Sequence, residues 1–139
     1  MDKHFSEMTV LIVDDDENVR EMLKNMLREI GLRKLVEARD GTEGVSAFQS
    51  KNNPVDIVLC DWNMPDMNGM EVMRHIRKLD GGGDCPFMMV TGRSDMDSVV
   101  EAKQAGVVAY IRKPFSVTQL EQKLKFVYGK MILDETKTG

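Results

Sequence analysis

Acidic side chains follow two apolar runs of the sequence, and they are of the type that binds a hard divalent cation. Asp14, Asp15 and Asp16 follow the run TVLIV, and Asp61 follows the run VDIVLC. Carboxylates about 5 Å apart repel each other by about 3 kcal/mol at an effective dielectric constant of about 20. Mg²⁺ would relieve that repulsion, because it prefers oxygen ligands and commonly binds one or two carboxylates together with water and phosphate oxygens.

A hydroxyl and an ammonium group follow two further apolar runs, and they suit a phosphate group. Thr91 follows the run FMMV, and Lys113 comes shortly after the run VVAYI. A carboxylate such as Asp61 can attack phosphorus and form an acyl phosphate, while a nearby cation neutralises the transferring group. Thr91 can donate a hydrogen bond to a phosphate oxygen, and Lys113 supplies a compact positive charge. The set therefore predicts phosphoryl transfer to Asp61.

Each of these residues alone also has an ordinary structural interpretation. An acidic run can cap a helix, and a single aspartate or threonine commonly occupies a turn. A single lysine is usually a solvated charge. For Asp16 we prefer the helix-cap interpretation. The joint occurrence of the other residues after four separate apolar runs favours a site, provided that the fold brings the ends of these runs together.

An alternation of strands and helices is predicted to position these residues. Short β-branched runs alternate with stretches of helical spacing, and five such repeats predict an α/β fold with an open, doubly wound parallel sheet. In such sheets, ligands bind at the carboxyl ends of the strands, which is where the candidate residues lie. The predicted strands are Thr9–Asp14, Leu35–Ala38, Val55–Cys60, Phe87–Val90 and Val107–Ile111.

The predicted helices have recognisable faces and ends. Apolar residues from Val19 to Ile30 recur at helical spacing and form one stripe, with Gly31 suited to the left-handed position that ends a helix. A capping box beginning at Ser116 predicts the start of the last helix. The other three helices are expected at Thr42–Lys51, Gly69–Leu79 and Ser94–Ala105, the last of them ended by Gly106.

Composition limits the class of protein. The 139 residues suit one domain, 1–139, and 42% of them are hydrophobic, which is ordinary for a soluble globular protein. The net charge of −4 argues against nucleic-acid binding. No apolar run approaches the roughly 20 residues of a membrane span, and the first residues lack the apolar core of a secretory signal. A cytoplasmic location is therefore expected.

The two cysteines, Cys60 and Cys85, are predicted to be reduced thiols. Cys60 ends one predicted strand, and Cys85 stands just before the start of the neighbouring parallel strand. They should lie at opposite ends of the sheet, more than about 10 Å apart, which is too far for a disulfide.

These motifs resemble those of the receiver domains of bacterial two-component systems, and most of all the CheY-type single-domain response regulators. The resemblance covers about residues 8–128 and implies a flavodoxin-like, CheY-like fold of five helices and five strands in the order 2-1-3-4-5. The segments that carry it are Asp61–Met70, Val13-Asp14-Asp15, Val90-Thr91 and Lys113-Pro114-Phe115.

The resemblance implies a role for each matching residue. Asp61 would accept a phosphoryl group from a sensor histidine kinase. Asp15 and Asp61 would bind Mg²⁺ by their side chains and Asn63 by its backbone carbonyl, with Asp14 orienting metal-bound water. Lys113 would pair with the phosphate, and the Lys113–Pro114 peptide bond would be cis.

The resemblance also implies a switch. Thr91 would move toward the phosphate, and the ring of Tyr110 would take up the space behind it. A downstream protein would then bind to the changed surface, roughly Asp95 to Tyr128, and the chain itself is expected to be a monomer. Neither nucleic acid nor a membrane is an expected partner.

Two positions beside the site vary among such domains, and both flank the route of the hydrolytic water. They are Asn63, two residues after the acceptor, and Arg93, two residues after Thr91, where chemotaxis regulators carry a glutamate. Our hypothesis is that Arg93 changes the lifetime of the phosphorylated form, by a bidentate contact that shields the phosphate. Trp62 is expected to be half exposed, and His75 to be a solvated helix residue.

The pathway stays open between three alternatives. The chain would be a chemotaxis-type switch, a phosphorelay intermediate, or the receiver module of a longer regulator such as a transcription factor or nucleotide cyclase. In the last case the polar chain after Tyr128 would be a linker. A Mg²⁺-dependent phosphatase of similar fold would need an acid where Asn63 stands, so we expect no enzyme beyond slow autodephosphorylation.

Overall fold

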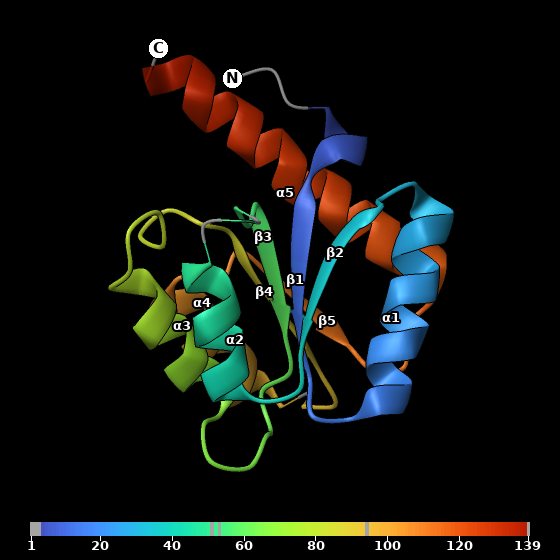
Figure 1. The fold of residues 1–139 in the computed structure, drawn as a ribbon, viewed down its shortest axis with the longest axis vertical. Coiled ribbons are helices and arrows are strands. Elements are labelled where there is room, and N and C mark those ends of the chain that lie inside the picture. Colours follow the sequence, from blue (N-terminus) through green and yellow to red (C-terminus); the bar gives the residue numbers. More distant parts are fainter. Residues whose placement is uncertain (1–3, 51, 53, 94, 139) are drawn as a thin grey trace.

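The computed structural model describes residues 4–50, 52, 54–93 and 95–138, and their five strands form one parallel sheet (Figure 1). The central strands β1 (Thr9–Val13), β3 (Ile57–Cys60) and β4 (Phe87–Thr91) are flanked by β2 (Lys34–Ala38) and β5 (Ala109–Arg112). The order β2-β1-β3-β4-β5 confirms the predicted fold class. The order reverses between β1 and β3, so the carboxyl ends of these two strands flank the place where such sheets bind ligands.

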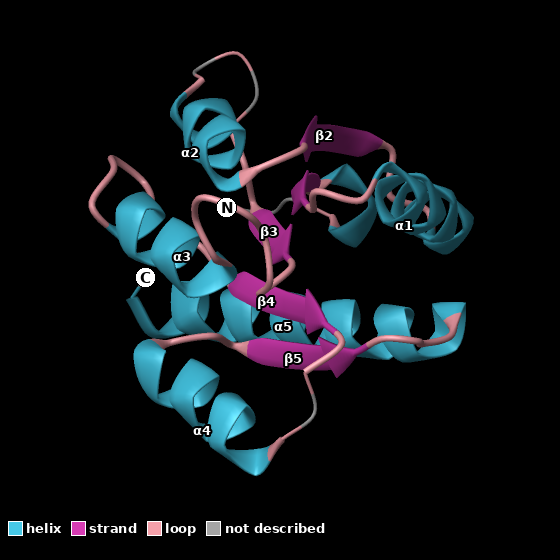
Figure 2. Ribbon diagram, turned by 90° about the horizontal axis from the view of Figure 1, so that it is seen from below, coloured by secondary structure: helices cyan, strands magenta, loops and turns pink. Residues whose placement is uncertain are grey.

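Helices cover both faces of the sheet, as Figures 1 and 2 show. The helices α1 (Glu17–Ile30) and α5 (Val117–Thr138) lie on one face. The other face is covered by α2 (Gly41–Gln49), α3 (Gly69–Arg77) and α4 (Met96–Ala105). A single 3-10 turn, Phe5–Glu7, precedes β1. Among the residues that the structure describes, no helix has the length and hydropathy of a membrane span.

Every residue of β3 and β4 is buried, because helices pack against both sides of these strands. The apolar stripe predicted for α1 is confirmed, since its Leu23 and Leu27 lie in the core beside Leu120, Leu124 and Val127 of α5. The sheet is therefore a rigid platform, and the loops at its carboxyl edge start from fixed positions.

Several predicted helix ends are confirmed, including Gly106 at the end of α4. The Asp16 side chain accepts hydrogen bonds from the backbone N–H groups of Asn18 and Val19, and so caps α1. Gly31 takes the left-handed conformation, with φ 110°, at the other end of this helix. The backbone N–H of Ser116 donates to Oε1 of Gln119, and the backbone N–H of Gln119 donates to Oγ of Ser116, which is the predicted capping box of α5.

Some predicted boundaries are wrong by one or two residues. The predicted third strand begins at Val55, whereas β3 begins at Ile57. The intervening Asp56 binds β1 through its side chain as well, since its carboxylate accepts from the backbone N–H of Thr9 at 2.7 Å. Lys51 and Ser94, predicted as helix termini, lie outside the described residues.

The residues after Tyr128, which would be a linker in a longer regulator, belong to α5, which continues to Thr138. Tyr128 and Met131 pack against the core on this extension. The ring of Tyr128 meets the ring of Phe5 edge to face, with 5.6 Å between centroids. These contacts reach the other end of the chain, which explains why the local sequence after Tyr128 did not indicate them.

Both cysteines are free, as predicted, and both are buried. Burial raises the pKa of Cys85 to about 12, and burial also raises the pKa of Cys60 well above the usual thiol range. The thiolate is the reactive form, so neither side chain should react in the folded protein. We expect alkylation at pH 8 to modify neither thiol in buffer and both in denaturant, as counted by intact mass. Rapid labelling of the native protein would contradict the burial of these thiols.

Candidate functional site

Acidic side chains from the ends of β1 and β3 form one cluster. Each of Asp14, Asp15 and Asp61 has a carboxylate oxygen within 4.8 Å of the others. Asp14 is 1% exposed and Asp61 is 9% exposed, whereas Asp15 is open to solvent. The backbone N–H of Asp61 donates to the carbonyl of Val13 at 3.0 Å, which ties the two strand ends together. The predicted convergence of these carboxylates is confirmed.

Lys113 extends from the loop after β5 into this acidic cluster. Its Nζ lies 3.0 Å from Oδ2 of Asp14 and 3.4 Å from Oδ2 of Asp61. Its backbone N–H donates to the carbonyl of Thr91 at 2.8 Å, and its peptide bond to Pro114 is cis, as predicted. The ammonium group therefore faces the carboxylates from the side opposite to β2.

The electrostatic balance of the cluster favours a divalent cation. Burial raises the pKa of Asp14, although hydrogen bonds from Asp16 and Lys113 oppose this effect. Burial also disfavours the charged form of Lys113, but its hydrogen bond to Asp14 and the nearby carboxylates outweigh that effect and raise its pKa. Three carboxylates face one ammonium group, and the excess negative charge suits Mg²⁺.

The donor set fits such an ion. One oxygen of Asp14 accepts a hydrogen bond from the backbone N–H of Asp16 at 2.9 Å, and the other pairs with Lys113. Both carboxylate oxygens of Asp14 are thus engaged in contacts within the protein, so Asp15 and Asp61 are better placed as direct ligands of the ion. This arrangement agrees with the roles that the resemblance implies for the three acids.

The two residues of the predicted switch lie on neighbouring strands and share a contact with Arg93. Thr91 ends β4 and is fully buried, and its Oγ1 accepts from the backbone N–H of Arg93 at 3.4 Å. Tyr110 of β5 is half-buried, and its hydroxyl donates to the carbonyl of Arg93 at 2.9 Å. Burial raises the pKa of Tyr110, so its hydroxyl remains a donor at neutral pH.

The side chain of Arg93 joins the loop after β3 to the first turn of α4. Its Nε donates to the amide oxygen of Asn63 at 3.0 Å, and Nη1 donates to Oγ of the buried Ser98 at 3.3 Å. Its guanidinium carbon lies 4.6 Å from the ring centroid of Trp62, within the range of a cation–π interaction. Arg93 and Asn63, the two positions expected to flank the route of the hydrolytic water, are therefore in direct contact.

The prediction that Trp62 is half exposed is wrong, because the side chain is only 4% exposed. Arg93 covers its ring, and the ring of Tyr110 meets it edge to face at 6.5 Å between centroids. Arg93 lies in the loop after β4 and Tyr110 lies on β5, and sequence spacing around Trp62 does not reveal either contact. His75 is exposed on α3, as predicted.

The loop that carries Asp61 folds back tightly onto itself. The backbone N–H of Gly69 donates to the carbonyl of Trp62 at 2.8 Å, and a Cβ at Gly69 would collide with the carbonyl oxygen of Asp61. Glycine is therefore required where α3 begins. Asp66, at the outer part of the loop, takes a left-handed conformation with φ 70°, which aspartate tolerates.

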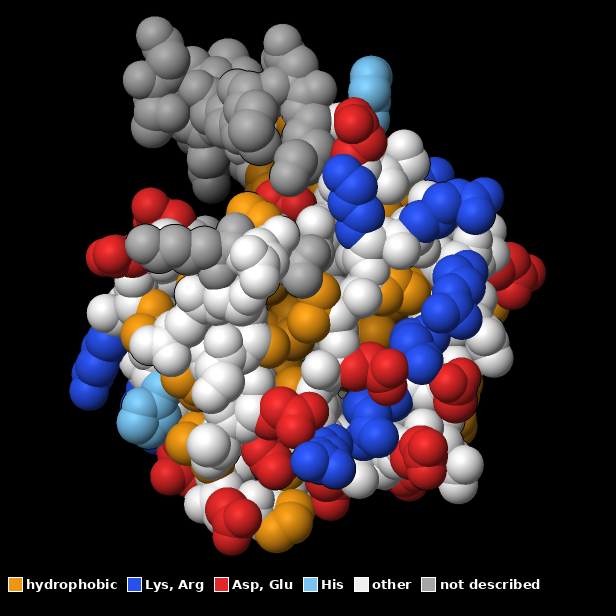
Figure 3. Space-filling view, in the orientation of Figure 1, with side chains coloured by type: hydrophobic (Ala, Val, Ile, Leu, Met, Phe, Trp, Pro, Cys, Tyr) orange, Lys and Arg blue, Asp and Glu red, His pale blue; other side chains and the backbone are white. Residues whose placement is uncertain are grey.

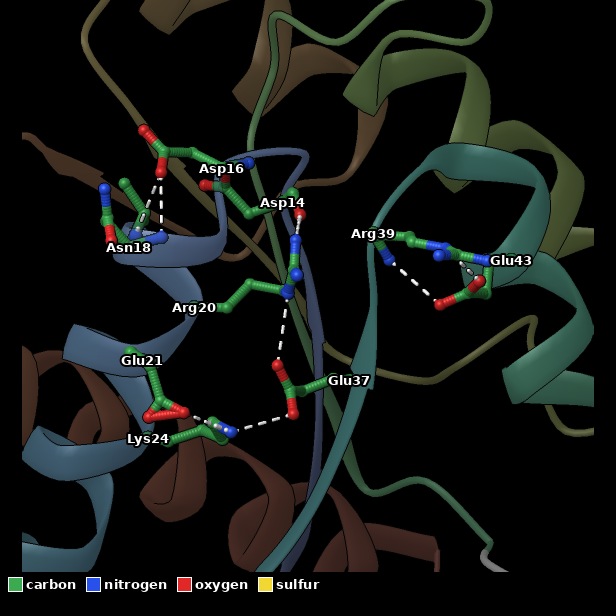
Figure 4. Close-up of polar contacts among 10 residues, drawn as sticks. Asp14, Asp16, Asn18, Arg20, Glu21, Lys24, Glu37, Arg39 and Glu43 are labelled. Carbon is green, nitrogen blue, oxygen red and sulfur yellow. Dashed lines mark hydrogen bonds and ion pairs between the residues drawn. The ribbon is translucent and has the colours of Figure 1, made fainter.

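Sequence reasoning missed one residue that contacts the acidic cluster. Arg20, in the first turn of α1, donates from Nη1 to the backbone carbonyl of Asp14 at 2.7 Å (Figure 4). Its position, four residues after the helix cap Asp16, is the signal that could have revealed it. Figure 3, in the orientation of Figure 1, shows acidic and basic side chains next to one another on the visible face of the molecule.

Comparisons with known proteins agree with this geometry. The family model described as the response regulator receiver domain matches residues 10–125. The chemotaxis protein CheY of Pseudomonas aeruginosa is 37% identical over 124 residues, which span 89% of this chain and 98% of the relative.

Two solved structures show the same fold. The chemotaxis protein CheY4 of Vibrio cholerae aligns with a TM-score of 0.80 and 29% identity, covering 87% of this chain and 98% of that one. The receiver domain of the sensor histidine kinase PA1611 from Pseudomonas aeruginosa aligns with a TM-score of 0.76 and 26% identity, covering 86% of this chain and 95% of that one. The latter was solved with a magnesium ion coordinated in its active site cleft.

Proposed function

The chain belongs to the response regulator receiver domain family, and we propose that it accepts a phosphoryl group on Asp61 and thereby changes its affinity for a partner protein. The observation that carries this proposal is the meeting of carboxylates from β1 and β3 with the ammonium group of Lys113. A sensor histidine kinase is the proposed donor. The similarity to CheY supports a chemotaxis-type pathway.

The chemistry is a displacement at phosphorus. A carboxylate oxygen of Asp61 attacks the phosphorus of a phosphohistidine, a P–O bond forms, and the P–N bond breaks with the electron pair passing to the imidazole nitrogen. Asp15, Asp61 and the backbone carbonyl of Asn63 would hold Mg²⁺, which when bound neutralises charge on the phosphoryl oxygens. The magnesium ion of the PA1611 receiver domain supports this assignment.

Lys113 and Thr91 then respond to the new charge. Lys113, already 3.4 Å from Asp61, would pair with the phosphoryl oxygens. Thr91 would give up the contact between its Oγ1 and the N–H of Arg93 in order to donate to the phosphate. Because Arg93 also holds the hydroxyl of Tyr110, this step would alter the support of the tyrosine ring. Phosphorylation would in this way shift a two-state equilibrium.

A groove beside β5 is the proposed binding surface for the downstream protein. Phe126 of α5 is 55% exposed at this groove, and Arg93 lies at its other side. The groove is basic although the chain has a net charge of −4, so an acidic, partly apolar segment suits it. Its basic lining residues are Arg93, Lys103, Arg112, Lys123 and Lys130.

We propose a switch rather than a phosphatase. A phosphatase that uses an aspartate nucleophile would need a proton donor near the leaving group. Asn63 stands two residues after Asp61, and its amide oxygen is bound by Arg93. The amide group has no acidic proton at neutral pH, so we expect slow autodephosphorylation and no turnover of small phosphate esters.

The test is incubation with a small acyl phosphate donor, with and without Mg²⁺. We expect the intact mass to increase by one phosphoryl group only when Mg²⁺ is present, and alkali to remove it, as it does from an acyl phosphate. Peptide mapping should place the group on Asp61. The proposal would be contradicted if phosphorylation did not depend on Mg²⁺, or if the phosphoryl group mapped to a serine or threonine.

Arg93→Glu is expected to shorten the lifetime of the phosphorylated form. The guanidinium group beside Asn63 shields one side of the site, and its loss should speed hydrolysis about fivefold, equivalent to about 1 kcal/mol. The measurement is the first-order loss of phosphate after the donor is removed. Arg112→Glu makes the same charge change on β5, at an exposed side chain, and is the matched control. An unchanged rate in Arg93→Glu would end the hypothesis.

A further inference from the structure

Arg20 is the basic residue of α1 that reaches the backbone of the acidic loop. Its side chain is 12% exposed, so the guanidinium group is largely withdrawn from water. Nη1 donates to the carbonyl oxygen of Asp14 at 2.7 Å, and Nε donates to Oε1 of Glu37 at 3.1 Å. Figure 4 shows the guanidinium group standing between these two partners. A single planar group thus spans the distance from β2 to the acidic loop.

Glu37 anchors this contact. It lies on β2, opposite Ile12 of β1 in the register of the sheet. Its second oxygen accepts from Nζ of Lys24 at 2.8 Å, and Lys24 also pairs with Glu21. The hydrogen bond from Lys24 lowers the pKa of Glu37, with Arg20 acting in the same direction. The carboxylate that orients Arg20 therefore stays charged and fixed at neutral pH.

The contact completes the restraint of the Asp14 backbone. The N–H of Asp14 donates to the carbonyl of Ala38 at 3.1 Å, and its carbonyl accepts from Arg20. The two peptide units that flank the Cα atom of Asp14 are thereby each held by one hydrogen bond. Asp15 follows directly, and its exposed carboxylate lies in the acidic cluster. A loop that is ordered before a ligand arrives loses less conformational entropy on binding it.

We propose that Arg20 is a positioning residue of the site: it holds the Asp14 carbonyl so that Asp14 and Asp15 are ordered for a divalent cation. This inference rests on the proposed function, because that function requires the cation. Arg20 itself touches neither the cation nor the phosphoryl group. It acts through the peptide between Asp14 and the ligand Asp15, as outer partners do in metal sites.

The competing interpretation is that Arg20 only ties α1 to β2. Lys24 does that without touching the acidic loop, because it pairs with the same Glu37 carboxylate from the next turn of the helix. A merely structural role predicts that removing Arg20 and removing Lys24 have the same consequences. A positioning role predicts that they differ in cation affinity but not in stability.

The experiment is a Mg²⁺ titration of the full chain, wild type against Arg20→Met and Lys24→Met. Mg²⁺ binding is monitored by calorimetry and by the fluorescence of the single tryptophan, Trp62, which adjoins Asp61. We expect Arg20→Met to weaken Mg²⁺ binding about tenfold, and Lys24→Met to change it by less than about twofold. The thermal midpoints of the two variants should fall by similar amounts.

A third variant, Arg20→Lys, allows the inference to be tested if Arg20→Met fails to fold. Arg20→Lys has one ammonium group, which can reach the Asp14 carbonyl or Glu37 but lacks the planar fork that joins them. Its Mg²⁺ affinity should lie between those of wild type and Arg20→Met. Equal affinities for the Arg20 and Lys24 variants would overturn the inference alone, whereas a wild-type chain that binds no Mg²⁺ would overturn the proposed function as well.

Discussion

Asp61→Asn is expected to lower phosphoryl incorporation from a small donor by at least about 100-fold, which corresponds to about 2.7 kcal/mol of transition-state free energy. The amide has nearly the same shape as the carboxylate but offers no anionic oxygen to attack phosphorus. The neutral side chain also removes one negative charge from the acidic cluster, so Mg²⁺ should bind more weakly. The measurement is the phosphorylated fraction by intact mass at fixed donor and Mg²⁺ concentrations.

The matched control is Asp66→Asn in the same loop. Asp66 is exposed and has a left-handed backbone conformation that asparagine also tolerates, so the change in charge and size is the same. We expect this variant to be labelled at the wild-type rate. If Asp61→Asn kept its label while Asp66→Asn lost it, the acceptor would have been assigned to the wrong residue.

Lys113→Met is expected to destabilise the fold and to strengthen Mg²⁺ binding at the same time. Without Lys113, the carboxylate of Asp14, only 1% exposed, lies buried beside Asp61 with its cationic partner removed. Breaking a buried ion pair costs several kcal/mol, and the 22% exposure of Lys113 reduces the expected loss to about 2 kcal/mol. Denaturant unfolding without metal is the measurement.

The affinity of Lys113→Met for Mg²⁺ should rise while its stability falls, because the variant lacks a positive charge beside the cation site. Added Mg²⁺ should then restore much of the lost stability, as a ligand of the native state does. Phosphoryl transfer should still be slower, since the ammonium group would no longer contact the phosphoryl oxygens. Lys125→Met, which removes an exposed pair with Glu121, is the control and should cost less than about 0.5 kcal/mol.

The pH dependence of this pair has a definite sign. The pKa of Lys113 is raised above 10.5, so the stability that its pairing contributes is fully present below that value. It is lost as the pH rises through the higher folded value. The stability difference between wild type and Lys113→Met should therefore be constant around neutral pH and shrink in strong alkali. A difference that vanished near pH 7 would contradict the raised pKa.

The positions of the chemical groups could be predicted because they depend on backbone topology alone. Asp14, Asp61 and Thr91 each lie at the end of a buried strand, and parallel strands end at one edge of the sheet. Once the alternation of strands and helices was recognised, these side chains had to converge. Helix ends such as Asp16 and Gly31 were predictable for a similar reason, since capping is a local property.

Contacts between distant side chains were not predictable. The burial of Trp62 depends on Arg93 and Tyr110, which lie 31 and 48 positions further along the chain. The bond from Arg20 to Asp14 depends on Glu37, which is on another strand. Long flexible side chains have many rotamers, and the choice among them is made by neighbours that the fold supplies. The spacing of residues in the sequence therefore does not predict the rotamer of such a side chain.

The contact between Phe5 and Tyr128 has a practical consequence for experiments that need a tether or a reporter. It places the start of β1 and the far part of α5 at the same end of the molecule (Figure 1). The carboxylates of the acidic cluster lie at the opposite end of β1, about 15 Å away at about 3.3 Å per residue. A fluorophore, affinity handle or surface linker joined near either end of the chain would leave the acidic cluster open to donors. Such attachments are therefore suited to monitoring phosphorylation in real time.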